Sequence, residues 1–282
     1  MPRCSYVIAF RSDDVTAGDT GEGPRSSNLS EVIRHVHTID DLEVIVVEHD
    51  STSNFRATAN SARANSASAN TQSGVRHVFL PGDGPFNKSW AMNVGFRAAT
   101  ASVIAFGDAD LIVETSVLTD AIASVENGFD ATKPFDRIVD LDEHQTADVR
   151  QRGITVDSSD ASSPMRRDAG EHLPFCGGLF ITRRELFEKV GGYDERFLGW
   201  GGEDDALSVK FARSGARLGI AEDQIAYHLW HGRQLSRYTH SSYQRNLERL
   251  QHLQQCSDEE LRRIFADDAS RMGDPHRPNL DS

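Results

Sequence analysis

Short apolar runs alternate with segments of helical periodicity through the first half of this 282-residue chain, and this alternation constrains its fold most strongly. Residues 6–10, 43–48 and 102–106 are short apolar runs of the kind found in buried strands. Between them, residues 29–36 carry apolar side chains at i, i+3, i+4 and i+7, and residues 87–100 also have a helical pattern. Strand–helix–strand repetition predicts an α/β fold with a mostly parallel central sheet flanked by helices.

The composition disfavours two classes of partner. No apolar run approaches the roughly 20 residues that a membrane-spanning helix needs, and the apolar stretch within residues 1–10 is too short for a signal peptide. We therefore expect no transmembrane segment and a cytoplasmic location. The formal net charge of −13 disfavours binding to nucleic acid or to anionic membranes. In such a field, a phosphate-rich ligand would need a cation or a few well-placed basic residues.

Three segments interrupt the α/β pattern. Residues 51–73 are rich in Ser, Ala, Asn and Thr, and suit either an exposed helix or a mobile loop. Residues 140–170 are polar with little periodicity, which predicts a surface loop, one that could order over substrate. From residue 241 onward, apolar residues recur at helical spacing. We therefore expect residues 241–282 to form a C-terminal helix and, from residue 273, a disordered tail.

Asp108 and Asp110 follow a buried strand directly, with Ala109 between them. Side chains two apart project to the same side of an extended chain, and parallel sheets bind ligands beyond the carboxyl ends of their strands. Mg²⁺ and Mn²⁺ take oxygen ligands, often one or two carboxylates together with substrate phosphates. The Asp-x-Asp sequence is therefore a candidate metal site, and a solvated turn is the alternative.

His228 and His231 stand three residues apart. On a helical turn, both imidazoles would share a face and could reach one metal ion. The alternative is one structural histidine packed beneath Trp230 and one solvated histidine. Imidazole together with carboxylate suits Mn²⁺, Co²⁺ or Zn²⁺ better than Mg²⁺ alone.

Residues 200–205 read Trp-Gly-Gly-Glu-Asp-Asp and precede a helical pattern. The three carboxylates would occupy the first turn of that helix, where the helix dipole favours anions. The glycine pair would let the backbone approach a ligand, while the tryptophan supplies a flat apolar face. A carboxylate at this place can also act as general base on an acceptor hydroxyl. Ordinary helix-start charge is the alternative, although it leaves the glycine pair unexplained.

Three further places are candidates for substrate contact. Gly177 and Gly178 enter an apolar strand, and permit either a close backbone approach to substrate or a bulge. Lys88 lies at a predicted helix start that could favour a phosphate, although burial of the helix through Trp90 explains the same pattern. Arg11 directly follows the first strand and could meet a nucleotide.

Several segments, taken in order, resemble the GT-A-fold glycosyltransferases, in particular the C-terminal region of the β-1,4-galactosyltransferases and glycosyltransferase family 2. The matching segments are residues 10–11, 86–89, 93–95, 106–110, 175–178, 191–195 and 199–205. The resemblance implies a GT-A domain over residues 1–240, with a donor-binding half at about 1–115 and an acceptor and catalytic half at about 116–240.

The resemblance also implies a metal-dependent inverting hexosyltransferase that uses a nucleotide-diphospho-sugar, usually a UDP-sugar, together with Mn²⁺. Asp110 and His231 would ligate the metal, and Asp108 would face the ribose or the metal. His228 stands where galactosyltransferases carry a methionine ligand, and a histidine there could tolerate Mg²⁺ better. Asp204 corresponds to the general base that deprotonates the acceptor hydroxyl.

Two larger sets follow from the same resemblance. The substrate-binding set is Trp200, Gly201, Gly202, Glu203, Gly177 and Gly178. The nucleotide-sugar set is Phe10, Arg11, Glu48, Asp50, Lys88, Asn93, Asp108 and Ala109. The implied reaction is a single in-line displacement, in which the metal and basic residues stabilise the departing diphosphate.

Three other functions compete with this interpretation. Retaining polypeptide N-acetylgalactosaminyltransferases share a similar Trp-Gly-Gly-Glu segment, although the Asp after Glu203 favours inversion. Sugar-phosphate nucleotidyltransferases also combine a parallel sheet with metal-binding acids, but residues 11–27 lack their glycine-rich basic loop. A non-catalytic carbohydrate-binding subunit would not need a metal site and a base in combination.

Overall fold

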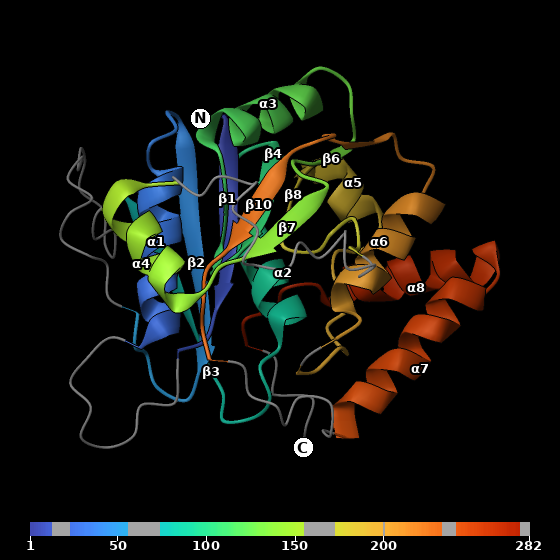
Figure 1. Ribbon diagram of the computed structural model, residues 1–282. Coiled ribbons are helices and arrows are strands. Elements are labelled where there is room, and N and C mark those ends of the chain that lie inside the picture. The colour runs from blue at the N-terminus through green and yellow to red at the C-terminus, as the bar shows by residue number, and fades with distance from the viewer. Residues whose placement is uncertain (13–22, 56–73, 155–172, 200, 233–240, 277–282) are drawn as a thin grey trace.

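The main sheet of the protein is built from the predicted apolar runs and lies at the centre of the computed structural model (Figure 1). The structure describes residues 1–12, 23–55, 74–154, 173–199, 201–232 and 241–276. In spatial order, the strands of this sheet are β3 (Val75–Pro81), β2 (Leu42–Asp50), β1 (Cys4–Phe10), β4 (Val103–Asp108), β8 (Leu179–Arg183), β6 (Ala131–Lys133) and β9 (Leu218–Ile220). β3, β2, β1 and β4 run parallel, whereas β8 is antiparallel to both β4 and β6. The predicted mostly parallel sheet is therefore confirmed.

A second, smaller sheet covers one face of the first. Its strands, in spatial order, are β5 (Leu111–Val113), β10 (Ile225–His228) and β7 (Arg137–Asp140). β10 is antiparallel to β5 and parallel to β7, so His228 lies opposite both Leu111 and Asp140. Only Ala109 and Asp110 separate β4 from β5. The small sheet thus carries His228 to the end of β4, and this second sheet was not predicted from the sequence pattern.

Helices cover both faces of the main sheet, and alternate side chains of β1 show the two layers. Tyr6, Ile8 and Phe10 belong to one apolar core, and Val7 and Ala9 belong to the other. The first core is closed by α1 (Pro24–Val36), α3 (Thr115–Glu126) and α4 (Glu143–Arg152) together with the small sheet. The second core is closed by α2 (Lys88–Ala98), α5 (Arg184–Lys189), α6 (Glu203–Arg213), α7 (Ser241–Gln255) and α8 (Asp258–Arg271).

The prediction of a surface loop over residues 140–170 is wrong for its first part. Helix α4 forms there, with Asp142 and Gln145 in a capping box in which each side chain bonds the other residue's backbone. The helix buries only Thr146 and Val149, and this small apolar contribution explains why no periodicity reveals it. Residues 155–172 and 56–73 lie outside the described part of the chain, so both predictions for these segments stay open.

The C-terminal segment is more extensively folded than expected. A second helix, α8, begins at the N-cap Ser257, and its Leu261 and Phe265 join the same core as α7. The expected disorder from residue 273 is wrong for residues 273–276. The Gly273 amide donates to Glu195 (2.6 Å), and the Trp90 indole donates to the Asp274 carbonyl (2.9 Å). These bonds tie the chain end to the core. Among the described residues, no helix combines the length and the apolarity that crossing a membrane requires.

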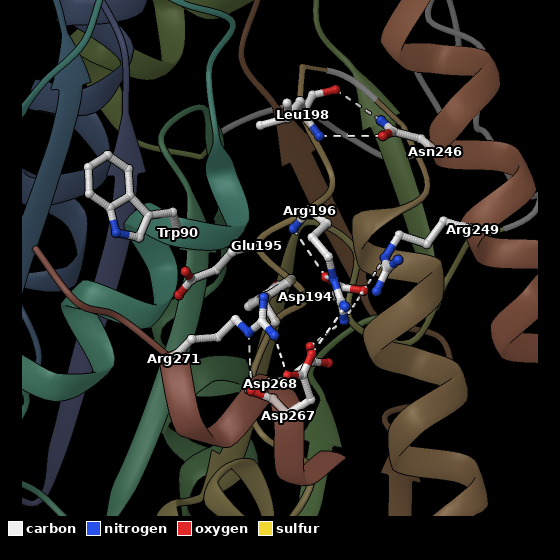
Figure 2. Close-up of polar contacts among 12 residues, drawn as sticks. Trp90, Asp194, Glu195, Arg196, Leu198, Asn246, Arg249, Asp267, Asp268 and Arg271 are labelled. Carbon is white, nitrogen blue, oxygen red and sulfur yellow. Dashed lines mark hydrogen bonds and ion pairs between the residues drawn. The ribbon is translucent and has the colours of Figure 1, made fainter. Parts of the chain in front are cut away.

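Buried charges join helices α6, α7 and α8 to the loop after α5 (Figure 2). The Lys210 ammonium is fully buried and donates to Asp268 (3.0 Å) and to the Gly192 carbonyl (2.6 Å). Asp268 also accepts from Arg196 (2.5 Å), which in turn donates to Asp194 (2.7 Å). Because these charges lie away from water, their pairing holds the C-terminal helices in one position.

Asp268→Ala is expected to lower the free energy of unfolding by about 3–5 kcal/mol, because it leaves the buried Lys210 charge without a carboxylate. The matched control is Asp267→Ala, which removes the neighbouring carboxylate, 41% exposed, and should cost less than about 1 kcal/mol. Urea denaturation of both variants measures the difference. Equal losses in the two variants would contradict this account of the buried pair.

Candidate active site

The candidate site lies where β4 ends and β5 begins. Asp108 is the last residue of β4, and its amide donates to the Gly178 carbonyl (2.8 Å). The carbonyl of Asp110 accepts from the Leu229 amide (2.8 Å). Residues from three distant parts of the sequence therefore meet at the carboxyl end of a central strand, which is the predicted place for ligand binding.

Asp110, His228 and His231 converge at this edge, and their ligand atoms all lie within 4.8 Å of one another. Asp110 Oδ2 is 3.2 Å from His231 Nε2, and Asp110 Oδ1 is 3.7 Å from His228 Nε2. His228 Nδ1 lies 3.0 Å from Asp140, which orients the ring. Burial would raise the pKa of Asp110, but the two histidines hold it below its usual range. Two imidazole nitrogens and a carboxylate are ligands that suit Mn²⁺, so these residues fit a metal site.

The two histidines do not share a helical turn as predicted. His228 ends strand β10, and His231 lies in the irregular segment that follows. Side chains of the surrounding helices hold that segment. Asn28 of α1 donates to the Trp230 carbonyl (3.1 Å), and the Trp230 amide donates to Thr146 of α4 (2.8 Å). These anchors were missed, since single polar residues in helices carry no signal of such a distant contact.

A second cluster of charges surrounds the Lys88 ammonium at the start of α2. It lies 2.9 Å from Asp108, 2.9 Å from Asp204 and 3.9 Å from Glu203. The Tyr193 hydroxyl donates to Asp204 as well (3.3 Å). Three carboxylates from β4 and α6 thus share one lysine. Asp108 pairs with this lysine and is not among the three converging residues of the histidine cluster, so its expected role as a metal ligand stays a prediction.

The environment of Asp204 changes its acidity. Only 17% of its side chain is exposed, and burial, together with the negative charges of Glu203 and Asp108, raises its pKa to about 7 against the opposing effect of Lys88. The pKa of Lys88 lies well above its usual value, because three carboxylates outweigh the effect of burial. A carboxylate that titrates near neutral pH can both accept and release a proton.

Lys133 was missed by the sequence analysis and completes this region. It ends β6, is buried, and donates to the carbonyls of Pro174 (2.7 Å) and Gly177 (2.9 Å). Burial lowers its pKa to about 8. The signal for it in the sequence is a lone lysine after a short apolar strand, which is common in surface strands as well. Lys133 holds the turn that carries Gly177 beside the end of β4.

The glycine pairs are required for packing within the chain. Gly201 and Gly202 have φ of +101° and +89°, in the left-handed region. A Cβ on Gly201 would lie 3.0 Å from the Tyr243 ring, and one on Gly202 would lie 3.0 Å from the Phe197 ring. Aromatic rings of the protein therefore occupy the space where a Cβ would lie on either glycine, and the expected approach of a ligand to their backbone stays a prediction. Trp200 lies outside the described residues.

The first pair, Gly177 and Gly178, behaves similarly. A Cβ on Gly177 would lie 2.9 Å from Pro174, and one on Gly178, where φ is +80°, would lie 3.3 Å from Leu111. Gly178 nevertheless lies next to Asp108 through its carbonyl. These contacts show a tightly packed backbone just before β8, and the two alternatives from the sequence, a close approach to substrate and a bulge, both stay predictions.

Three of the predicted nucleotide contacts have their side chains in the interior. Phe10 is 2% exposed and lies in the first core. Glu48 is fully buried and accepts from the amides of Asn54 (2.6 Å) and Phe55 (3.0 Å). Asn93 is fully buried and bonds the backbone of Tyr193 in both directions. These side chains pack within or bond to the protein itself, and their expected contact with a nucleotide stays a prediction.

The other predicted nucleotide contacts lie at the edge of the sheet. Arg11 donates to the Gly84 carbonyl (2.7 Å), and Asp50 accepts from the Ser12 hydroxyl (2.6 Å). Ala109 lies between the two aspartates and is half-buried. The structure therefore brings Lys88, Asp108 and the α6 acids together. Arg11 lies just after β1, and Asp50 is the last residue of β2.

Comparison with known families identifies the class. Residues 25–191 match glycosyl transferase family 2, and residues 168–242 match the N-terminal domain of galactosyltransferase. Because the first match spans more than half of the chain, the protein belongs to glycosyltransferase family 2. It is a glycosyltransferase of the kind that uses nucleotide-sugars.

Curated relatives match only part of the chain. The Drosophila melanogaster N-acetylgalactosaminyltransferase 7 is 29% identical over 157 residues, which cover 49% of this chain and 26% of that protein. The human polypeptide N-acetylgalactosaminyltransferase 3 is 38% identical over 56 residues, which cover 20% of this chain and 9% of that protein. The chain therefore spans well under half of the length of these relatives.

Solved structures confirm the GT-A fold. The glucosyl-3-phosphoglycerate synthase of Mycobacterium tuberculosis, solved with Mn²⁺, UDP and phosphoglyceric acid, aligns with a TM-score of 0.55 and 17% identity. That alignment covers 91% of this chain and 80% of the synthase chain. GalNAc-T7, solved with UDP, GalNAc and Mn²⁺, gives 0.56 and 16%, and covers 95% of this chain and 54% of that one.

Asp204→Asn is expected to change how the stability of the protein depends on pH. The pKa of Asp204 is about 7 in the folded protein and 3.8 for a free side chain, so the folded state favours the protonated carboxyl. The stability from this preference is full below the lower pKa and is lost as pH rises through the higher one. Between pH 4 and pH 8, wild type should therefore lose stability relative to the variant. Urea denaturation across this range measures it, and a constant difference would contradict the raised pKa.

Proposed function

We propose that the protein is a metal-dependent inverting glycosyltransferase that moves a sugar from a nucleotide-diphospho-sugar, most simply a UDP-sugar, to an acceptor hydroxyl. One observation carries the proposal. Asp204, a carboxylate with a pKa of about 7, lies across Lys88 from Asp108, at the strand end that also carries the Asp110 and histidine cluster. A general base and a candidate metal site thus share one edge of the sheet.

The donor side of the site would be formed by residues at the ends of β4 and β10. Asp110, His231 and His228 would hold Mn²⁺, with Mg²⁺ as a possible substitute. When bound, the metal would supply charge to stabilise the departing diphosphate. Lys88, at the N-terminal end of α2, offers a second positive charge to the same group. Two similar structures were solved with Mn²⁺ and UDP, which supports this choice of ligands.

The acceptor side would be served by Asp204. In its ionised form, Asp204 takes the proton of the acceptor hydroxyl while that oxygen forms a bond to the anomeric carbon. The bond between the anomeric carbon and the diphosphate oxygen breaks in the same step, so the configuration inverts. Lys88 and Tyr193 hold the carboxylate in one orientation through the bonds described above. A pKa near 7 suits this duty, because both protonation states are populated at neutral pH.

A retaining N-acetylgalactosaminyltransferase-like enzyme is the second candidate function. The similarity to the Drosophila N-acetylgalactosaminyltransferase 7, which extends along 49% of this chain, favours it. The two functions differ in the product, because inversion and retention give opposite anomeric configurations from the same donor. A proton NMR spectrum of the first product separates them. Membership of a transferase family leaves little support for a nucleotidyltransferase or a non-catalytic carbohydrate-binding subunit.

The direct test is a screen of UDP- and GDP-sugars for transfer or hydrolysis in the presence of Mn²⁺. With the best donor, Asp204→Asn is expected to lower kcat by about 10²–10⁴-fold, because it removes general base catalysis. Binding of UDP, measured by calorimetry, should change little. No response to any nucleotide-sugar would count against the proposed function as a whole.

Asp205→Asn is the matched control, since it makes the same chemical change one residue further along the first turn of α6. We expect it to keep most of the wild-type rate. If Asp204→Asn turned over at the rate of this control, the base would have to be another group.

His231→Ala is expected to weaken Mn²⁺ binding by at least about tenfold, because it removes one of three converging ligands. Electron paramagnetic resonance of free Mn²⁺ measures the affinity without any assay of activity. His144→Ala removes a histidine that is 86% exposed and serves as the control. Unchanged affinity in His231→Ala would place the metal elsewhere.

A further inference from the structure

Helix α7 contacts the loop that leads into the catalytic turn of α6, and one buried side chain, Asn246, makes three hydrogen bonds to the backbone of that loop. Asn246 is 2% exposed. Its amide nitrogen donates to the carbonyls of Leu198 (3.0 Å) and Gly201 (3.0 Å), and its oxygen accepts from the Leu198 amide (3.4 Å). Figure 2 shows the pair of bonds between Asn246 and Leu198. One side chain thus holds the backbone at two points of residues 198–201.

Neighbouring positions on α7 hold the same loop. Tyr243, one turn earlier, packs against Gly201 so closely that a Cβ there would lie 3.0 Å from its ring. Arg249, one turn later, donates to the fully buried Asp194 carboxylate. Tyr243, Asn246 and Arg249 are spaced three residues apart, so they form one face of the helix. We call these three residues the α7 clamp.

The loop depends on this clamp because of its own backbone. Gly199, Gly201 and Gly202 all have positive φ, and glycine loses more conformational freedom on folding than any other residue. Gly202 is the N-cap of α6 and makes no side-chain cap bond, so the first turn with Asp204 gets no local anchor from its cap. Bonds from outside the loop must therefore hold its position.

We propose that Asn246 is a positioning residue for the acceptor side of the reaction. It would hold residues 198–202, and through them the start of α6, so that Asp204 faces the acceptor hydroxyl. The donor side would be independent of it, because Asp110, His228 and His231 come from the junction of β4 and β5 and from β10 and the segment after it. The expected effect on acceptor kinetics rests on the proposed function. The expected effect on the position of the loop does not.

The structural test is hydrogen–deuterium exchange of the whole chain. Asn246→Ala is expected to speed exchange of the amides in residues 198–206 by about tenfold or more, because the loop and the start of α6 lose the anchor from α7 and keep those from Phe86, Lys88 and Tyr193. The control is Gln244→Ala, on the exposed side of the same helix. In the described part of the chain, the Gln244 amide donates to Glu248 (3.1 Å) and not to the loop. The control should leave exchange in this loop unchanged.

The kinetic test separates the two sides of the reaction. In Asn246→Ala, kcat/KM for the acceptor should fall by about tenfold, since misplacing a catalytic group by a fraction of an ångström has effects of this size. The dissociation constants of UDP and Mn²⁺ should stay within about twofold of wild type. Asn246→Asp, of the same size, loses both bonds to carbonyls and should give the same pattern even if the alanine variant folds poorly.

The outcomes distinguish failure of this proposal from failure of the proposed function. If wild type transfers no sugar, the proposed function fails, and hydrogen exchange still decides whether Asn246 holds the loop. If exchange in residues 198–206 is unchanged in both Asn246 variants, the proposal is overturned. It is also overturned if donor binding falls as much as acceptor turnover, because Asn246 would then support the whole domain and not one side of it.

Discussion

The shared contact of the Lys88 ammonium with three carboxylates is the interaction on which the candidate site depends. It joins the start of α2, the end of β4 and the first turn of α6, and 116 residues separate Lys88 from Asp204. Without this charge, Asp108, Glu203 and Asp204 would repel one another in a largely buried space. With it, Asp204 keeps a pKa near neutrality, and the three elements stay in register. The same lysine therefore contributes to the fold and to the chemistry.

Two separate frameworks hold the two sides of the site. The small sheet places His228 opposite Leu111 and Asp140, and helices α1 and α4 hold the segment that leads to His231. On the other side, α7 and α8 hold the loop before α6 through Asn246 and a buried charge network. A glycosyltransferase has to bind a donor and an acceptor in turn. Separate supports would let one side adjust while the other keeps its geometry.

Much of this arrangement could be predicted from local pattern. The strand that ends in Asp108 and the helix that begins with Glu203 were both recognisable, because apolar periodicity and acidic strand ends are local signals. The burial of Glu48 and Asn93 was not predicted, and the reason is physical. A polar side chain in an apolar segment looks exposed or functional, yet it is stable in the interior when backbone groups satisfy it, and such partners come from distant residues. The division of the C-terminal helical segment into α7 and α8 was not predicted, because the apolar spacing indicated a single helix from residue 241.

The sequence by itself determined the α/β layering, the membership of a glycosyltransferase family and the set of acids and histidines from which a site could be built. Those features follow from side-chain periodicity and from short motifs that need no partner. Tertiary structure alone decided that these residues form two groups, one of Asp110 with the two histidines and one of three carboxylates around Lys88. Register between β10, β5 and β7 placed His228 beside Asp110, while the start of α2 placed Lys88 at the end of β4, where it pairs with Asp108. The acidity of Asp204 belongs to the tertiary structure as well, because a pKa depends on burial and neighbouring charge, and neither exists until the chain has folded.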